Sequence, residues 1–303
     1  MLSFIVNTIV VLLSFWSLPT TLAYVSGDWH GAEVCAEAQH LPAGNDRVSP
    51  PKLAPVVAAK SAAVLSDDGH VWLSLKAADS RQPIASITKL MTALVFLENN
   101  PGWDKDYTIY RQDLVEGGKI NLFLGETVKI KDLFHASLVA SDNGATLSLA
   151  RATGLKDTEF IEKMNKKAKS LGLMQTKFSD PIGLNNDNLS TAKDVARLAQ
   201  AALNQSEIAA AVLLPAYHFQ TAQGKTKDLE STDWLLASDM PANIQSLGGK
   251  TGYTDQAGYC FVGRFRDNQG RSVIAVVLDS GSKNERFRQA RDLAVWAFTY
   301  CQW

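Results

Sequence analysis

Two groups of apolar runs, one towards each end of the chain, predict β-strands. Residues 61–65 and 71–75 flank a turn signal at 67–69 and therefore predict a β-hairpin. After position 245 the pattern again predicts strands, at 249–253, 258–265 and 272–278. We expect these segments to form one antiparallel sheet of about five strands whose edges are distant in the sequence.

Helical periodicity dominates the middle of the chain and its last residues. It predicts helices over 132–140, 145–153 and 158–171, a helix opened by a capping box at Thr191 and Asp194, and an amphipathic helix over 286–303. Residues 84–97 also have helical spacing but are apolar on nearly every face, so this helix has to be buried on all sides. The order of the elements predicts an α+β fold, a sheet with flanking helices and an inserted helical subdomain.

The first 23 residues contain no charged side chain, and residues 4–18 form an apolar stretch. Small residues follow up to Ala23, which is typical of an export signal cleaved after that residue, although the usual positive start is missing. An uncleaved membrane anchor is the alternative, because the apolar span approaches the roughly 20 residues that a bilayer requires. Residues 24–55 are rich in Ala, Pro and Gly and predict a linker, so that residues 56–303 form the folded domain.

Composition excludes several classes of protein. Among 303 residues, 46% are hydrophobic and 20% are charged, which is typical of a globular chain. The formal net charge of −1, without long runs of one sign, argues against nucleic-acid binding. An odd number of cysteines (Cys35, Cys260 and Cys301) leaves at least one thiol unpaired, and neither these nor the five scattered histidines have metal-site spacing. We expect no cofactor.

Three short motifs occur in a fixed order: S-x-x-K at 86–89, S-D-N at 141–143 and K-T-G at 250–252. Each is common by chance, but together they are the set found in class A β-lactamases and penicillin-binding proteins. A serine hydroxyl such as that of Ser86 needs a base in order to attack. Lys89 lies three residues on, on the same helix face, and can accept the proton if burial and the nearby cation Lys250 lower its pKa. The alternative, a solvated helix lysine, is disfavoured because this helix has no hydrophilic face.

The other two motifs supply groups for proton transfer and substrate binding. Ser141 can relay the proton to the leaving amine, Asn143 can hold a substrate amide, and Asp142 is expected to point away as a helix cap. The third motif is predicted on a strand that faces a cleft, where a peptide can add as a further strand. Lys250 and Thr251 would then meet a carboxylate, while Gly252 would allow close approach to the backbone. A nucleotide-binding loop is excluded because Ile244 occupies the position of a required glycine.

With these motifs the chain resembles low-molecular-mass penicillin-binding proteins of the D-alanyl-D-alanine carboxypeptidase family, the S11 serine peptidases. The resemblance covers about residues 58–297 and rests on 83–92, 178–184 with 190–192, and 250–260. It implies a β-lactamase/DD-peptidase-like fold and the following roles: acyl-enzyme formation at Ser86, proton acceptance by Lys89, completion of the centre by Ser141 and Asn143, substrate binding by Lys250, and an oxyanion hole from the backbone N–H groups of Ser86 and Tyr253.

Two departures from the family pattern matter. Many relatives carry Thr-Asn before a Leu-Leu pair upstream of K-T-G, whereas this chain has Thr232 and Asp233 there. The chain also ends at Trp303, so we expect it to lack the second β-domain and terminal anchor of many carboxypeptidase relatives, as in the shorter endopeptidase branch.

These observations predict an exported D-Ala-D-Ala carboxypeptidase, in the periplasm or at the extracytoplasmic face of the envelope. Its expected partners are peptidoglycan stem peptides and β-lactams as covalent inhibitors, with membrane attachment only through the N-terminal segment. An endopeptidase that cleaves D-Ala cross-links is the alternative. A β-lactamase is disfavoured because no E-x-x-L-N string is present, and a silent penicillin sensor is disfavoured because Ser86, Lys89 and Lys250 are intact.

Overall fold

The computed structural model describes residues 53–118, 120–237 and 240–303. The predicted export signal at 1–23 and nearly all of the predicted linker at 24–55 lie outside these ranges. Within them, no helix is both long and apolar enough to cross a membrane.

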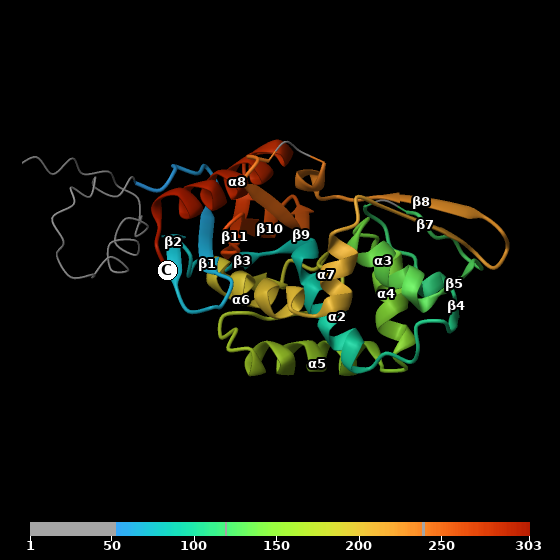
Figure 1. The fold of residues 1–303 in the computed structure, drawn as a ribbon. Coiled ribbons are helices and arrows are strands. Elements are labelled where there is room, and N and C mark those ends of the chain that lie inside the picture. The colour runs from blue at the N-terminus through green and yellow to red at the C-terminus, as the bar shows by residue number, and fades with distance from the viewer. Residues whose placement is uncertain (1–52, 119, 238–239) are drawn as a thin grey trace, which may run out of the picture.

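A five-stranded antiparallel sheet forms the centre of the molecule, in the order β2-β1-β11-β10-β9 (Figure 1). Its strands are β1 (Ser61–Ser66), β2 (Trp72–Lys76), β9 (Ile244–Thr254), β10 (Gly258–Asp267) and β11 (Ser272–Ser280). The predicted hairpin and the three C-terminal strands are therefore confirmed, and β1 pairs with β11 as the predicted single sheet requires. Strand β9 lies at one edge of this sheet, so one side of its backbone is available to other groups.

Helices cover both faces of the sheet. Helix α8 (Lys283–Tyr300) packs on one face, where Phe261, Phe265 and Phe287 belong to one apolar cluster. Helix α6 (Ala192–Leu203) packs on the other face, in a larger cluster that includes Val262 and Ile274. Because alternate residues of a strand point to opposite faces, β10 and β11 contribute to both clusters. The result is a three-layer arrangement with β9 at one edge of the sheet (Figure 1).

The remaining helices build the inserted subdomain. They are α2 (Lys89–Glu98), α3 (Ile130–Leu138), α4 (Asn143–Ala152), α5 (Asp157–Ser170) and α7 (Ser206–Val212). All but α7 were predicted, and every residue of α2 from Lys89 to Phe96 is buried, as its apolar faces require. The predicted capping residue Thr191 opens α6 and accepts a hydrogen bond from Asp194 N. Burial of α2 on all sides fixes the residues at its N-terminus.

Short paired segments complete the fold and were not predicted. They are β3 (Gln82–Pro83) with β6 (Leu189–Ser190), β4 (Asp106–Thr108) with β5 (Thr127–Lys129), and β7 (Ala216–Gln220) with β8 (Thr226–Glu230). The β7–β8 hairpin extends over α3 and α4 (Figure 1). Three 3-10 turns also occur in the described residues: η1 (Ala85–Thr88), η2 (Arg111–Asp113) and η3 (Trp234–Leu236).

The cysteines agree with the odd count noted in the sequence. Cys260 is a free thiol buried in β10, whereas Cys301 is disulfide-bonded. Cys35 lies outside the described residues. The prediction of at least one unpaired thiol is thus confirmed by Cys260.

Candidate active site

Ser86 and Lys89 lie at the junction between η1 and α2. Lys89 is fully buried, and its Nζ lies 2.8 Å from each of three oxygens: Ser86 Oγ, Asn143 Oδ1 and Ile182 O. The residue before the serine, Ala85, has a φ of 47°, in the left-handed region that non-glycine residues rarely adopt. The solvated-lysine alternative is therefore wrong, and the amine is directed at the Ser86 hydroxyl.

Burial is the main influence on Lys89. It lowers the pKa of this lysine to about 7, while Asp142 and Asp180 act in the opposite direction. A pKa near 7 leaves a large neutral fraction at physiological pH, and only neutral lysine can accept a proton. The sequence predicted that Lys250 would lower the pKa of Lys89, but the main causes of the Lys89 shift are burial, Asp142 and Asp180. The effect is instead on Lys250, whose pKa is lowered well below its ordinary value by burial, then by Lys89 and Arg286.

The loop formed by residues 178–184 contacts Lys89 through the carbonyl oxygen of Ile182. Asp180 accepts hydrogen bonds from Ile182 N at 2.6 Å and from Gly183 N at 2.5 Å, which turns Ile182 O towards Lys89. Gly183 has a φ of 87°, and a Cβ there would lie within 2.0 Å of Ala85 O. The S-x-x-K turn and this loop therefore pack backbone against backbone, and the glycine is required by that contact.

The S-D-N motif lies in the joint between α3 and α4. Ser141 has a φ of 58° and its Oγ accepts a hydrogen bond from Lys250 Nζ at 2.8 Å. Asp142 points away and caps α4 by accepting from Ala145 N at 2.8 Å, as expected. Asn143 is more fully engaged than expected: Lys89 donates to its Oδ1, and its Nδ2 donates to Gly117 O at 3.1 Å. One amide hydrogen of Asn143 thus remains for a substrate.

The K-T-G motif occupies β9, as predicted. Lys250 is only 1% exposed, and its Nζ donates to Ser141 Oγ at 2.8 Å and to Thr251 O at 3.1 Å. It therefore lies behind Ser141 rather than on the open surface. Thr251 lines the cavity, and its Oγ1 donates to Thr232 Oγ1 at 2.8 Å.

Gly252 has a structural reason that the sequence did not reveal. A Cβ at this position would lie 2.7 Å from Ile84 O and 3.3 Å from Ser86 N. The missing side chain therefore lets β9 pack directly against the turn that carries the serine. Ser86 is also the second residue of η1, where backbone N–H groups have no partner within the helix, so its N–H can donate to a ligand.

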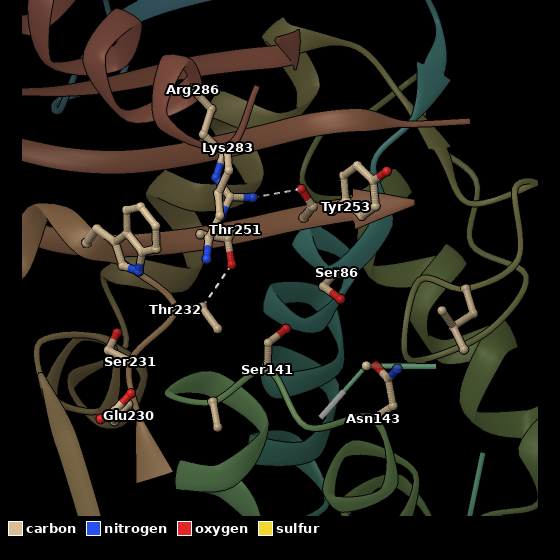
Figure 2. Close-up of a pocket in the computed structure, with 15 residues that line it drawn as sticks. Ser86, Ser141, Asn143, Glu230, Ser231, Thr232, Thr251, Tyr253, Lys283 and Arg286 are labelled. Carbon is tan, nitrogen blue, oxygen red and sulfur yellow. Dashed lines mark hydrogen bonds between the residues drawn. The ribbon is translucent and has the colours of Figure 1, made fainter. Parts of the chain in front are cut away.

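These residues surround one cavity of about 430 Å³. Of the eight residues predicted for the site, Ser86, Ser141, Asn143, Thr251, Gly252 and Tyr253 line it, and Lys89 and Lys250 lie directly behind. Figure 2 shows Ser86 and Ser141 in the middle of the cavity, with Asn143 on one side and Glu230 to Thr232 on the other. In the part of the chain that the structure describes, no group of three or more His, Cys, Asp or Glu side chains is arranged to hold a metal ion.

Several lining residues were not predicted, and Arg286 is foremost. It comes from the first turn of α8, is 4% exposed, and its NH1 group donates to Gly252 O at 3.2 Å. Thr232, Trp234 and Lys283 also line the cavity, with Lys283 Nζ 3.9 Å from the centre of the Trp234 ring. No local pattern marks Arg286, Trp234 or Lys283 as site residues, whereas Thr232 belongs to the string upstream of K-T-G that was noted in the sequence.

Comparison with known proteins places these observations in a family. The sequence profile described as D-alanyl-D-alanine carboxypeptidase, peptidase family S11, matches residues 47–282. A D-alanyl-D-alanine endopeptidase of Haemophilus influenzae is 35% identical over 72% of this chain and 75% of its own. The D-alanyl-D-alanine carboxypeptidase DacF of Bacillus subtilis is 32% identical over 80% of this chain and 62% of its own.

A solved structure agrees with the sequence relatives. The Streptomyces K15 DD-transpeptidase superposes with a TM-score of 0.74 and 29% identity, covering 82% of this chain and 100% of that chain. The predicted DD-peptidase-like fold is thereby confirmed. The chain belongs to the D-alanyl-D-alanine carboxypeptidase family of serine peptidases, S11.

Proposed function

We propose that the protein hydrolyses the peptide bond of D-Ala-D-Ala termini in peptidoglycan stem peptides through an acyl-enzyme at Ser86. The observation that carries this proposal is the fully buried Lys89 Nζ, 2.8 Å from Ser86 Oγ, with a pKa of about 7. Neutral Lys89 accepts the hydroxyl proton as Ser86 Oγ bonds to the carbonyl carbon of the penultimate D-Ala. The backbone N–H groups of Ser86 and Tyr253 donate hydrogen bonds to the carbonyl oxygen and stabilise the negative charge that develops on it.

Departure of the amine, which completes formation of the acyl-enzyme, uses Ser141. Its Oγ accepts from Lys250 Nζ, which leaves its own hydrogen free to pass to the leaving nitrogen. The carbon–nitrogen bond then breaks, the amine leaves with that proton, and Lys89 restores the proton to Ser141. Water then bonds to the ester carbonyl carbon while neutral Lys89 accepts one of its protons. The bond between Ser86 Oγ and the acyl carbon breaks, and Lys89 returns that proton to Ser86.

We place the terminal carboxylate of the substrate at the Thr251 end of the cavity. Thr251, Thr232 and Arg286 line this end, and the Lys250 ammonium lies behind it. Cationic and hydroxyl donors around one point suit a carboxylate. The bond that is cleaved then lies over Ser86, with the acyl part of the substrate towards Asn143.

Cleavage of D-Ala cross-links is a second candidate, and one observation favours it. A further cavity of about 250 Å³ shares Ala140 and Glu230 with the first and is lined mostly by the β7–β8 hairpin. Glu230 lies on the same side of the first cavity as Thr232, where the leaving group is placed (Figure 2), so this second cavity offers room for a group larger than one alanine. Relatives named as endopeptidases and as carboxypeptidases are both found among the similar chains.

Export follows from the N-terminal pattern and from this substrate. We propose that residues 1–23 direct the protein to the periplasm or the outer face of the cell envelope, where stem peptides and β-lactams are encountered. β-Lactams would acylate Ser86 because they mimic the acyl-D-Ala-D-Ala terminus.

Covalent labelling and product analysis test these points. A labelled penicillin should mark the wild type and leave Ser86→Ala unmarked. Equal labelling of both proteins would refute the assignment of Ser86 as the nucleophile. Monomeric and cross-linked muropeptides, incubated separately, then distinguish loss of D-Ala from cleavage of the cross-link. Lys250→Ala should weaken cleavage of free-carboxylate peptides more than of matched C-terminal amides, by ~10-fold or more, since charge-assisted hydrogen bonds contribute about 1.5–3 kcal/mol.

A further inference from the structure

The cavity of about 250 Å³ under the β7–β8 hairpin adjoins the catalytic cavity at the point where the leaving group departs. Its walls are formed by Asn121, Ala140, Ala216, His218, Asp228, Leu229 and Glu230. Ala140 and Glu230 also line the catalytic cavity, and Glu230 lies on the opposite side of it from Asn143 (Figure 2). Ala140 directly precedes Ser141, whose hydroxyl is assigned to the leaving nitrogen. A group attached to that nitrogen therefore starts next to this second cavity.

Contacts on the other side of the hairpin hold this wall in place. Tyr217 of β7 donates from its hydroxyl to Asp132 Oδ1 at 2.7 Å, and its ring stacks on that of His135 with centroids 4.2 Å apart. Lys227 of β8 is nearly buried, and its Nζ lies 2.7 Å from Glu126 Oε2. The hairpin is thus fixed to α3 and to the 126–127 segment, and the cavity is formed before any ligand enters it.

The ionisable groups of the second cavity differ in sign from those of the first. The register of the hairpin places His218 opposite Asp228, and their Nδ1 and Oδ1 atoms are 2.5 Å apart. Glu230 adds a second carboxylate on the same strand face, two residues along β8. No lysine or arginine of the described chain lines this cavity, whereas Lys283 and Arg286 line the catalytic one. The second cavity therefore suits hydrogen-bond donors and cations and disfavours anions.

The leaving residue of a substrate carries its carboxylate and its side chain on one carbon atom. With the carboxylate at the Thr251 end, the side chain is free to point elsewhere. The methyl group of D-alanine is too short to fill a further cavity. In a cross-link made through a diamino acid, by contrast, the side chain is long and continues into the amide bonds of the second stem peptide.

We propose that the second cavity binds the side chain of the leaving residue and favours a long side chain that ends in an amide or ammonium group over one that ends in a carboxylate. The inference rests on the proposed function, because that function fixes the carboxylate of the leaving residue at the Thr251 end. The cavity would make cleavage of a cross-link depend on residues that removal of a terminal D-alanine does not use.

Four synthetic peptides test this inference. All have the same acyl group and the same D-Ala carbonyl at the bond that is cleaved, and they differ only in the last residue: D-alanine, Nε-acetyl-D-lysine, D-lysine or D-2-aminoadipate. The terminal carboxylate is thus constant, while the side chain varies in length and charge. The value of kcat/KM for each peptide is measured from release of the last residue.

Ala216→Phe tests the space in the cavity, because Ala216 lines the second cavity and is not among the residues that line the first. The ratio of kcat/KM for the acetyl-lysine peptide to that for the D-alanine peptide should fall by ~10-fold or more, and Ala216→Val should lower it less. Ala222→Phe is the matched control, since Ala222 is exposed at the turn of the same hairpin, and its ratio should stay within ~2-fold of wild type. A ratio does not depend on how much of a preparation is folded.

Glu230→Gln tests the charge of the cavity. The wild type should cleave the D-lysine peptide ~10-fold better than the aminoadipate peptide, because two carboxylates face the end of the side chain and exposed charges interact weakly. Glu230→Gln should reduce this preference by ~3-fold. Glu162→Gln, which makes the same change at an exposed position of α5, should leave the preference as it is.

Each part of the inference has a result that would overturn it. If Ala216→Phe keeps the wild-type ratio, the side chain of the leaving residue lies outside the second cavity. If the wild type cleaves the D-lysine and aminoadipate peptides equally, or Glu230→Gln keeps the full preference, the acidic lining does not select the side chain. If the wild type cleaves none of the four peptides, the proposed function itself fails, and this result is seen before any variants are compared.

Discussion

The rate at which penicillin acylates Ser86 should follow the titration of Lys89. Burial lowers the pKa of this lysine to about 7, so its neutral fraction is about 10% at pH 6, half at pH 7 and about 90% at pH 8. The rate constant should therefore rise by ~10-fold between pH 6 and pH 8 and then level off. A lysine with an ordinary pKa would instead give a rise of ~10-fold for every pH unit up to about pH 10.

Stopped-flow measurement with a fluorescent penicillin gives this profile as a second-order rate constant. Lys89→Arg keeps a positive charge but cannot lose its proton at these pH values, so its rate should be lower by at least ~100-fold and should show no titration near pH 7. The reasoning fails if the wild-type rate keeps rising well beyond pH 8. It also fails if the arginine variant acylates within a few-fold of wild type, since Lys89 would then act as a fixed charge.

Three further substitutions or treatments test other parts of the structure. Gly252→Ala places a Cβ 2.7 Å from Ile84 O, so urea denaturation should show a loss of ~1–3 kcal/mol together with slower acylation, and wild-type values would mean that the serine turn moves freely. Burial raises the pKa of Asp233 from 3.8 to about 6, so the folded state binds this proton more tightly than the unfolded state and loses stability as pH rises from about 4 to about 6. Asp233→Asn should therefore be more stable than wild type by up to ~3 kcal/mol above that range and equal below it, and equal denaturation midpoints at pH 8 would contradict this. Cys260 is buried with its pKa raised to about 12, so iodoacetamide should modify it only after unfolding, and a mass increase in the native protein would be inconsistent with that burial.

The elements of the central sheet were predictable because their side chains follow simple patterns. Strands β1 and β11 are nearly continuous apolar runs, and turn residues separate each from its neighbour. The β7–β8 hairpin was missed because its inward positions are not all apolar. Lys227, on the inner side of β8, is nearly buried and pairs with the buried Glu126 at 2.7 Å, so an ion pair occupies a place where a pattern of apolar residues would be sought.

The centre of the site was predictable for a different reason. Ser86 and Lys89 are held by local helix geometry, and the S-D-N and K-T-G strings are short enough to be recognised without knowing their neighbours. Asp233 was marked only as a departure from the family pattern, and Arg286 carries no local signal. Arg286 reaches the cavity because α8 packs on β10 and β11 and β10 pairs with β9, so that Arg286 NH1 donates to Gly252 O, 34 positions away in the sequence.

Arg286 and Asp233 belong to a group of four buried, ionisable side chains around the active site, together with Lys89 and Lys250. Burial lowers the pKa values of Lys89, Lys250 and Arg286 and raises that of Asp233, so each of the four is held against its preferred charge state. Such groups reduce the stability of a fold and are expected where function requires them. At the Thr251 end, Arg286 lines the cavity and Lys250 lies directly behind it. In the proposed binding mode, a substrate carboxylate at this end favours the ammonium form of Lys250 while neutral Lys89 remains free to accept the proton of Ser86.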